Sequence, residues 1–224
     1  AIIIGVVVGG VIGLVNGLII TKLEIPPLIT TLGTQYIVKG MTNVITQGKP
    51  VTGFPESFNF IGGGSVAGIP VPVFFAAILF VLAFIIYKYT TFGRKLLAVG
   101  GNKETARLCG INSTRIQIIA FIIAGATAAL VGVLTAARLS SAQAAAGTGI
   151  EMTYIASVVI GGTSLSGGNS STVGTLIGVG IMETLTVTTT LLHIDTYYQK
   201  IVVGIIIIVA VGIDVVRHKR LARG

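Results

Sequence analysis

The chain has 224 residues, of which 53% are hydrophobic and only 10% are charged, and its mean hydropathy is +0.96. This small share of charged residues cannot cover the surface of a soluble domain of this length. The composition therefore excludes an ordinary water-soluble protein and indicates one that lies in a lipid bilayer. The net charge of +8 does not indicate nucleic acid binding, because the Lys and Arg residues lie in short loops and at the C-terminus, between apolar stretches.

Apolar stretches in chain order predict the membrane crossings, since a helix needs about 20 apolar residues to cross the hydrocarbon core. The candidates are 1–20, 28–46, 71–87, 116–137, 151–165, 172–192 and 199–216. Of these, 28–46 and 151–165 are more polar, and we expect them to face protein or a cavity. The prediction is an all-α, polytopic transmembrane helical bundle with about seven crossings, forming a single domain over residues 1–224. Since the chain begins inside an apolar run without Met, we expect more sequence upstream.

Glycines repeat at a spacing of four in the first candidate span, and small residues let membrane helices approach closely. We therefore predict that this stripe packs against another helix. The same packing role is assigned to four glycines near the last loops. The predicted packing positions are Gly5, Gly9, Gly13, Gly17, Gly161, Gly162, Gly174 and Gly178.

The Lys and Arg residues predict the orientation, because basic loops stay in the cytoplasm. Lys49, Arg138 and Lys200 then fall outside, and the C-terminus is cytoplasmic. This alternation closes only if 151–165 crosses the membrane. The residues placed on the cytoplasmic side are Lys22, Lys88, Arg94, Lys95, Lys103, Arg107, Arg115, Arg217, Lys219, Arg220 and Arg223.

The basic loop over 92–117 contains a predicted short helix over 102–109. Asn102 is a good N-cap, Glu104 suits the first turn, Arg107 suits the last turn and Gly110 supplies a stop. A helix this short is not stable alone. The residues by themselves leave two readings open: a helix held by a partner surface, or a solvated loop that only sets the topology.

Several motifs resemble permeases of the monosaccharide ATP-binding-cassette (ABC) importers, most of all those of the ribose type. The resemblance covers nearly the whole chain in order. The motifs are Thr31-Leu32-Gly33-Thr34, Gly100-Gly101-Asn102, Ala106-Arg107-Leu108, Gly110-Ile111-Asn112, Ala137-Arg138-Leu139-Ser140-Ser141-Ala142-Gln143, Ala146-Gly147-Thr148-Gly149 with Glu151, Val158-Val159-Ile160-Gly161-Gly162-Thr163-Ser164-Leu165, Gly167-Gly168, Gly174-Thr175-Leu176-Ile177-Gly178 and Tyr197-Tyr198-Gln199.

The resemblance implies a permease subunit of about ten crossings, so some three would precede residue 1. It implies a bacterial plasma membrane location and a homodimer of permease copies. It also implies an extracytoplasmic sugar-binding protein and a separate ATPase that carries ATP and Mg²⁺, so no cofactor is expected in this chain. The loop over about 92–115 would be the coupling loop that docks on the ATPase, through Gly100, Gly101, Asn102, Glu104, Ala106, Arg107 and Gly110.

The chain departs from the ribose-type pattern near its sixth candidate span. Thr186-Val187-Thr188-Thr189-Thr190 replaces an Asn-Asn-Gly-Leu-Asn run, Glu183 replaces a small or apolar residue, and Ala144 replaces a proline. These changes leave the identity of the sugar open.

A sugar path needs many weak hydrogen-bonding groups, so that the solute can enter and leave. The candidates for this path are Thr31, Thr34, Gln35, Asn43, Glu183, Thr186 and Thr189. For each Thr, the alternative is a hydroxyl that bonds back to its own helix. For Glu183, a neutral acid bonded to a neighbouring helix or subunit is an equal alternative.

Other functions find less support in the sequence. Cys109, His193 and His218 lack the neighbours of a metal site or a catalytic centre, and no phosphate-binding loop occurs. We therefore expect neither metal nor enzymatic chemistry in this chain. Two alternatives remain: an ABC permease for a different small polar solute, and a stand-alone secondary transporter or channel with Glu183 as a proton-coupling acid.

Overall fold

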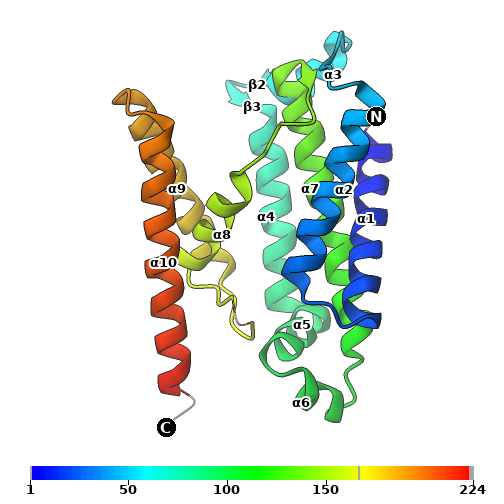
Figure 1. The fold of residues 1–224 in the computed structure, drawn as a ribbon, viewed down its shortest axis with the longest axis vertical. Helices are drawn as coiled ribbons and strands as arrows, with labels where there is room; N and C mark the ends of the chain where they lie inside the picture. Colours follow the sequence, from blue (N-terminus) through cyan, green and yellow to red (C-terminus); the bar gives the residue numbers. More distant parts are fainter. Residues whose placement is uncertain (1, 166, 222–224) are drawn as a thin grey trace. The chain divides into compact units, whose positions relative to one another are not determined.

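The computed structural model describes residues 2–165 and 167–221, with side chains described at all of these except 196, 210 and 213–221. The predicted cytoplasmic residues Arg217, Lys219 and Arg220 therefore lie outside the described side chains, and Arg223 lies outside the described residues. Helices dominate this range, and the all-α class is confirmed. The elements are α1 Ile2–Lys22, α2 Pro27–Thr46, β1 Val51–Thr52, α3 Glu56–Gly63, β2 Ser65–Val66, β3 Ile69–Pro70, α4 Val71–Tyr89, α5 Thr91–Gly101, α6 Lys103–Leu108, α7 Ser113–Leu139, β4 Ser141–Ala142, α8 Ile150–Ile160, α9 Thr172–Leu191 and α10 Thr196–Leu221 (Figure 1).

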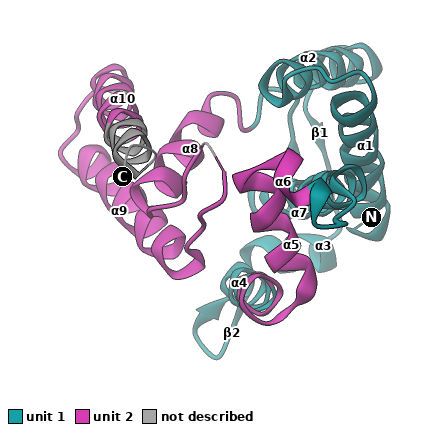
Figure 2. Ribbon diagram, turned by 90° about the horizontal axis from the view of Figure 1, so that it is seen from below, with its two compact units in different colours: residues 1–82, 107–146 teal, residues 83–106, 147–224 magenta. Residues whose placement is uncertain are grey.

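The chain divides into two compact units, which Figure 2 colours separately. Unit 1 consists of residues 1–82 and 107–146, and unit 2 of residues 83–106 and 147–224. Unit 1 holds α1, α2, α3 and α7, and unit 2 holds α5, α8, α9 and α10. Each unit is therefore built from segments that are far apart in the sequence.

Four helices of the described residues are long and apolar enough to cross a membrane: α1, α4, α7 and α9. The α2 helix has 20 residues with a more polar composition, and α10 contains an apolar stretch over Tyr197–Val209. The prediction for 151–165 needs correction, because α8 has only 11 residues and ends at Ile160. At 1.5 Å per residue it is about 16 Å long, roughly half of the hydrocarbon core. The total of seven crossings stays a prediction.

Unit 1 is organised by close packing of α1 on α7, which lie side by side in Figure 1. A Cβ atom added to Gly13 would meet the backbone carbonyl of Phe121, and one added to Gly9 would meet that of Gly125. A Cβ atom on Gly17 would lie 3.0 Å from the Cα atom of Ile118. The glycine stripe therefore faces α7 at backbone contact, which no larger residue permits.

The two ends of unit 1 keep apart the basic residues that the sequence assigns to opposite sides of the membrane. Gly5 lies beside Val133 and Gly17 beside Ile118, so α1 and α7 run antiparallel and bring Lys22 to the same end as Arg115. At the opposite end, which holds Lys49 and Arg138, β1 pairs antiparallel with β4 through Val51–Ala142 and Thr52–Ser141. At this same end, Gly62 of α3 meets the backbone of Ala137 and Arg138.

Unit 2 is held by a second set of glycine contacts, between α8 and α9. Gly161 and Gly174 face one another, so that a Cβ atom on either would meet the carbonyl oxygen of the other, and Gly178 meets the carbonyl of Ser157. Gly162 does not take part: its φ is +83° and a Cβ atom there would meet nothing within 4 Å. The predicted packing role of Gly162 is therefore wrong, and it is instead a turn residue just past the end of α8.

The small core of unit 2 is a separate cluster, formed by α8, α9 and α10. Ala156 of α8, Met182 of α9 and Val203 of α10 are buried together, with Ile160, Ile206 and Ile207 packed against them. The three helices thus converge on one cluster, and their other faces are left to lipid or to further protein.

Adding one methyl group to the stripe tests the α1–α7 contact. Gly13→Ala should lower the stability of the protein by about 1–3 kcal/mol, because the new Cβ atom overpacks against backbone that cannot move aside. The control is Gly10→Ala in the same helix, where the nearest atom would lie 3.8 Å away. This control should be neutral or stabilising, since Ala is a better helix former than Gly. The measurement is thermal unfolding in detergent, and equal midpoints for the two variants would refute the contact.

Candidate functional site

The candidate site residues gather in three places: a short helix in the basic loop, a cavity in unit 1 and a cavity in unit 2. Each is formed within a few neighbouring elements. The geometry of each decides which of the sequence predictions it brings together.

The basic loop is built by two successive caps. At the start, the Thr90 hydroxyl accepts a hydrogen bond from the N–H of Gly93 at 3.1 Å and begins α5. At the end of α5, the Asn102 N–H donates to the Ala98 carbonyl at 3.1 Å. The Asn102 side chain then accepts from the N–H of Thr105 at 2.9 Å. Asn102 therefore closes one helix and opens the next, as its capping chemistry predicts.

The α6 helix, Lys103–Leu108, confirms the predicted short helix with slightly narrower bounds. It stops at Gly110, whose φ is +77° and whose N–H donates to the Arg107 carbonyl at 3.0 Å. Within α6 only Ala106 is buried, while Glu104 and Arg107 are exposed. The six residues thus present nearly all of their side chains to the surroundings.

Leu108 is the residue of this loop that sequence reasoning missed. Its side chain is 88% exposed at the last position of α6. A large apolar side chain this exposed at the end of a polar helix offers apolar area whose burial against a partner would be stabilising. The available signal was its place at the end of a short polar helix, directly after Arg107.

The cavity of unit 1 has a volume of about 330 Å³ and lies where α1, α2 and α7 meet. It joins three of the predicted path residues, Thr31, Thr34 and Gln35, and adds Asn16 of α1. Its other lining residues are mostly small or aliphatic: Gly9, Ile12, Val38, Gly125, Ala128 and Ala129. Asn43, predicted on the same path, is not among the lining residues.

Asn16 is the second residue that sequence reasoning missed. It is only 9% exposed, and its side-chain oxygen accepts a hydrogen bond from the Thr34 hydroxyl at 2.6 Å. A single amide inside an apolar run was the available signal. Because a buried polar group needs a partner, the Asn16–Thr34 pair fixes how α2 lies on α1 and gives the cavity a polar wall.

The threonine hydroxyls bond back to their own helices, as the alternative reading predicts. Thr31 donates to the Pro27 carbonyl at 3.0 Å, Thr186 to that of Met182 at 3.0 Å and Thr189 to that of Leu185 at 3.0 Å. Such a hydroxyl keeps its own lone pairs, so it can still accept a hydrogen bond from a solute.

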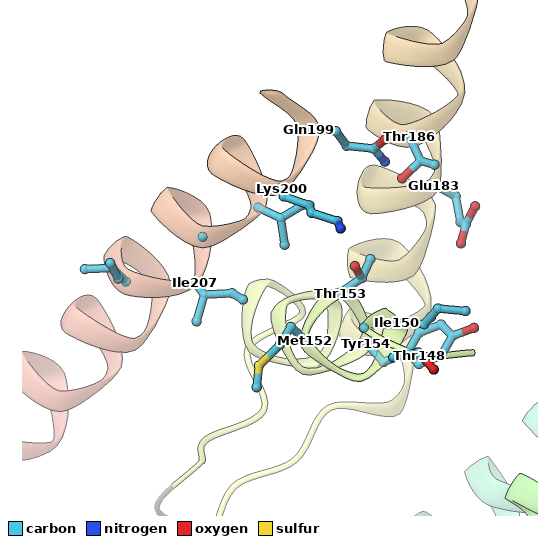
Figure 3. Close-up of a pocket in the computed structure, with 14 residues that line it drawn as sticks. Thr148, Ile150, Met152, Thr153, Tyr154, Glu183, Thr186, Gln199, Lys200 and Ile207 are labelled. Carbon is cyan, nitrogen blue, oxygen red and sulfur yellow. The ribbon is translucent and has the colours of Figure 1, made fainter. Parts of the chain in front are cut away.

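The cavity of unit 2 is larger, about 830 Å³, and opens between the first turn of α8, the second half of α9 and the first half of α10. It brings together the predicted Glu183 and Thr186 with Gln199 and Lys200, which sequence reasoning did not select. In Figure 3, Gln199 and Lys200 extend from α10 toward α9, and Thr186 faces Gln199. Thr189 is not part of the lining.

The cavity offers both hydrogen-bond donors and acceptors on one apolar surface. Glu183 is a strong acceptor, Lys200 a strong donor, and Gln199, Thr186 and Thr153 supply neutral groups. Glu183 projects away from Lys200 (Figure 3), so these two described residues leave their charges unpaired with one another. Aliphatic side chains, among them Ile150, Val203 and Ile207, form most of the remaining wall.

Comparison with known proteins gives a consistent family. The model of the family "branched-chain amino acid transport system / permease component" matches residues 1–211. The ribose import permease protein RbsC of Bacillus subtilis is 44% identical over 201 residues, which are 89% of this chain and 62% of that protein. RbsC of Escherichia coli K12 is 44% identical over 210 residues, 92% of this chain and 65% of that protein.

A third relative carries a different sugar in its name. The D-allose transport system permease protein AlsC of E. coli K12 is 41% identical over 212 residues, 94% of this chain and 64% of that protein. The chain thus spans less than two thirds of the length of the curated relatives it matches. No solved structure matches it. Since the family model covers residues 1–211, the chain belongs to the permease component family of the branched-chain amino acid transport system type.

Proposed function

We propose that this chain forms part of the membrane-spanning subunit of an ABC importer that carries a monosaccharide into the cell. The observation that carries the proposal is the capped α6 helix with its exposed Leu108, in a chain that belongs to a permease family. The names of the relatives, ribose import permease and D-allose transport system permease, support a sugar as the solute. Since both a pentose and a hexose are named, the solute is assigned here only as a monosaccharide.

Energy reaches the chain from outside in this proposal. The sequence has no phosphate-binding loop, so ATP and Mg²⁺ belong on a partner ATPase. The docking residues are those of the coupling loop, now with Leu108 at the contact: its apolar side chain fits a hydrophobic cleft, and Arg107 beside it supplies charge. Burial against the partner also accounts for a helix of six residues, which is too short to be stable alone.

The two cavities supply the proposed solute path. A sugar has many hydroxyls and no charge, so it is matched by amide and hydroxyl groups such as Asn16 and Gln35 in unit 1 and Thr186 and Gln199 in unit 2. Glu183 and Lys200 add strong acceptor and donor groups, while the aliphatic walls suit the apolar faces of a sugar ring. The helices rock between a state open to the outside and a state open to the cytoplasm, and the ATPase contacts these two states differently.

The complete transporter then contains this permease in two copies, two ATPase domains and an extracytoplasmic sugar-binding protein, in a bacterial plasma membrane with the C-terminus inside. Within unit 1, the residues assigned to the cytoplasmic side, Lys22 and Arg115, lie at one end, and those assigned to the outside, Lys49 and Arg138, lie at the other, which is consistent with this orientation.

One observation favours a second candidate, a secondary transporter that acts alone. Glu183 lies at a cavity wall without an ion-pair partner among the described residues, a position that a proton-coupling acid would occupy. The two candidates are separated by the energy source. Uptake that a protonophore abolishes and ATP depletion leaves intact would select the secondary transporter.

Removal of the exposed leucine tests the docking of the ATPase. Leu108→Ser should weaken retention of the ATPase by the purified permease about tenfold or more, because burying a leucine side chain contributes about 1.5–3 kcal/mol. The control is Leu139→Ser, an exposed leucine at the far end of α7, which should leave retention unchanged. The effect is measured by co-purification of the ATPase with the permease and by the affinity of the two proteins for one another. Full retention of the ATPase by Leu108→Ser would remove the proposed contact.

Neutralising Glu183 tests the path in unit 2. Glu183→Gln should assemble normally but lower the rate of sugar uptake roughly two- to tenfold, since a hydrogen bond to a neutral amide is weaker than one to a carboxylate. Thr184→Val is the control: it is the next residue of α9, its hydroxyl bonds to the Gly180 carbonyl at 2.7 Å, and it does not line the cavity. Uptake is measured with labelled D-ribose and D-allose in proteoliposomes. Wild-type rates with both sugars would mean that the carboxylate plays no part.

A further inference from the structure

A contact between two glycine pairs joins the coupling loop to the turn between α8 and α9, inside unit 2. Gly100 and Gly101 are the last residues of α5, and Gly167 and Gly168 lie in that turn. A Cβ atom added to Gly167 would meet the carbonyl oxygen of Gly100, and one added to Gly168 would lie 2.8 Å from the Cα atom of Gly101. The two backbones therefore touch with no side chain between them. We call these four residues the glycine contact.

The backbone at this turn also demands glycine for its own conformation. Gly167 has φ +87° and Gly168 has φ +78°, in the left-handed region where side chains are strained. Two independent constraints, the close approach and the positive φ, thus meet at the same two residues. A turn that served only to connect α8 to α9 would need the positive φ but not the close approach to α5.

The turn is attached firmly to the start of α9. The Ser164 N–H donates to the Asn169 carbonyl at 3.1 Å, which closes the turn. The Ser171 N–H donates to the Thr163 hydroxyl at 3.3 Å, and that hydroxyl lies 3.2 Å from the hydroxyl of Thr175 in the first turn of α9. The Ser171 side chain caps α9 by accepting from the Gly174 N–H at 3.0 Å. A displacement of the turn must therefore displace the N-terminus of α9.

The α8 helix must follow a movement of α9, because Gly161 and Gly174 hold the backbones of the two helices in contact. Both helices line the 830 Å³ cavity, α8 through its first turn and α9 through Glu183 and Thr186. A continuous chain of backbone contacts thus leads from the end of α5 to the cavity wall. Asn102 and α6 follow Gly101 directly in the sequence.

We infer that Gly167 and Gly168 are positioning residues for transport: they carry the motion of the coupling loop to the α8–α9 pair, through backbone contact with Gly100 and Gly101. The inference rests on the proposed function, since it needs a partner that moves the coupling loop. It assigns a specific task to the turn, which is to remain in contact with α5 while the cavity changes its access.

The test compares two glycines of one turn that differ only in the contact. Gly167→Ala places a Cβ atom against the Gly100 carbonyl, whereas Gly162→Ala, at φ +83°, imposes the same backbone strain in open space. Both are made in the full-length protein within the assembled transporter in proteoliposomes. The readouts are ATP hydrolysis and uptake of labelled D-ribose and D-allose, and the amount of assembled transporter is determined for each variant.

Gly167→Ala should keep ATP hydrolysis within about twofold of wild type and lower the number of sugars moved per ATP about tenfold. Gly162→Ala should leave that ratio within about twofold. An unchanged ratio in Gly167→Ala, or an equal fall in both variants, overturns the inference, because a merely structural role reduces the amount of transporter and leaves the ratio untouched.

A milder pair decides the question if Gly167→Ala does not assemble. In the turn itself, a Cβ atom on Gly168, at φ +78°, would lie 2.8 Å from the Gly101 Cα atom, while one on Gly162 would meet nothing within 4 Å. Gly168→Ala should lower the ratio about threefold and Gly162→Ala should not, and equal ratios for the two refute the glycine contact. Failure of the proposed function looks different: uptake by the wild-type transporter would then not depend on ATP at all.

Discussion

Backbone contact through glycine is the constraint on which the rest of this structure depends. Lipid offers no hydrophobic drive for one apolar helix to leave it for another, so association comes from van der Waals packing, and packing is closest where side chains are smallest. In unit 1 the contact of Gly13 with Phe121 sets the separation of α1 and α7, and in unit 2 that of Gly161 with Gly174 sets the separation of α8 and α9. The cavity of unit 1 lies beside its pair, since Gly9 and Gly125 line it, whereas the cavity of unit 2 lies further along α8 and α9 from Gly161 and Gly174.

Length and hydropathy were sufficient to predict the long helices, because α1, α4, α7 and α9 each contain an apolar stretch long enough to cross the hydrocarbon core. The same measures failed for 151–165. An apolar stretch shows that a segment avoids water, and it does not show where a helix stops. The end of α8 is set by the positive φ of Gly162. This is a property of one backbone position, and a hydropathy averaged over many residues does not reveal it. The pairing of β1 with β4 was also invisible, since each strand has only two residues.

The candidate site divides in the same way between local and tertiary causes. Asn102 and Gly110 were predictable, because a cap depends on a few adjacent residues. Asn16 was not, since its partner Thr34 is 18 residues away and reaches it only after α2 folds back on α1. Leu108 was missed because an apolar residue is ordinarily assigned to the interior, whereas in α6 the buried position is Ala106. Gln199 and Lys200 became relevant only when α10 was placed against α8 and α9.

Unit 2 places chemistry and mechanical contact at different points of one helix. The α9 helix begins at Thr172, beside the turn of the glycine contact, and Glu183 lies eleven residues further on, about 16 Å along the axis at 1.5 Å per residue. A hydrogen-bonded helix transmits a displacement of its end with little loss, so polar groups of the cavity need no contact with the coupling loop in order to move with it. Substitutions at Glu183 and Thr186 can therefore change what the cavity binds without changing the backbone contacts that move it. In the proposed importer, solute preference and energy coupling are then separable properties of a single helix.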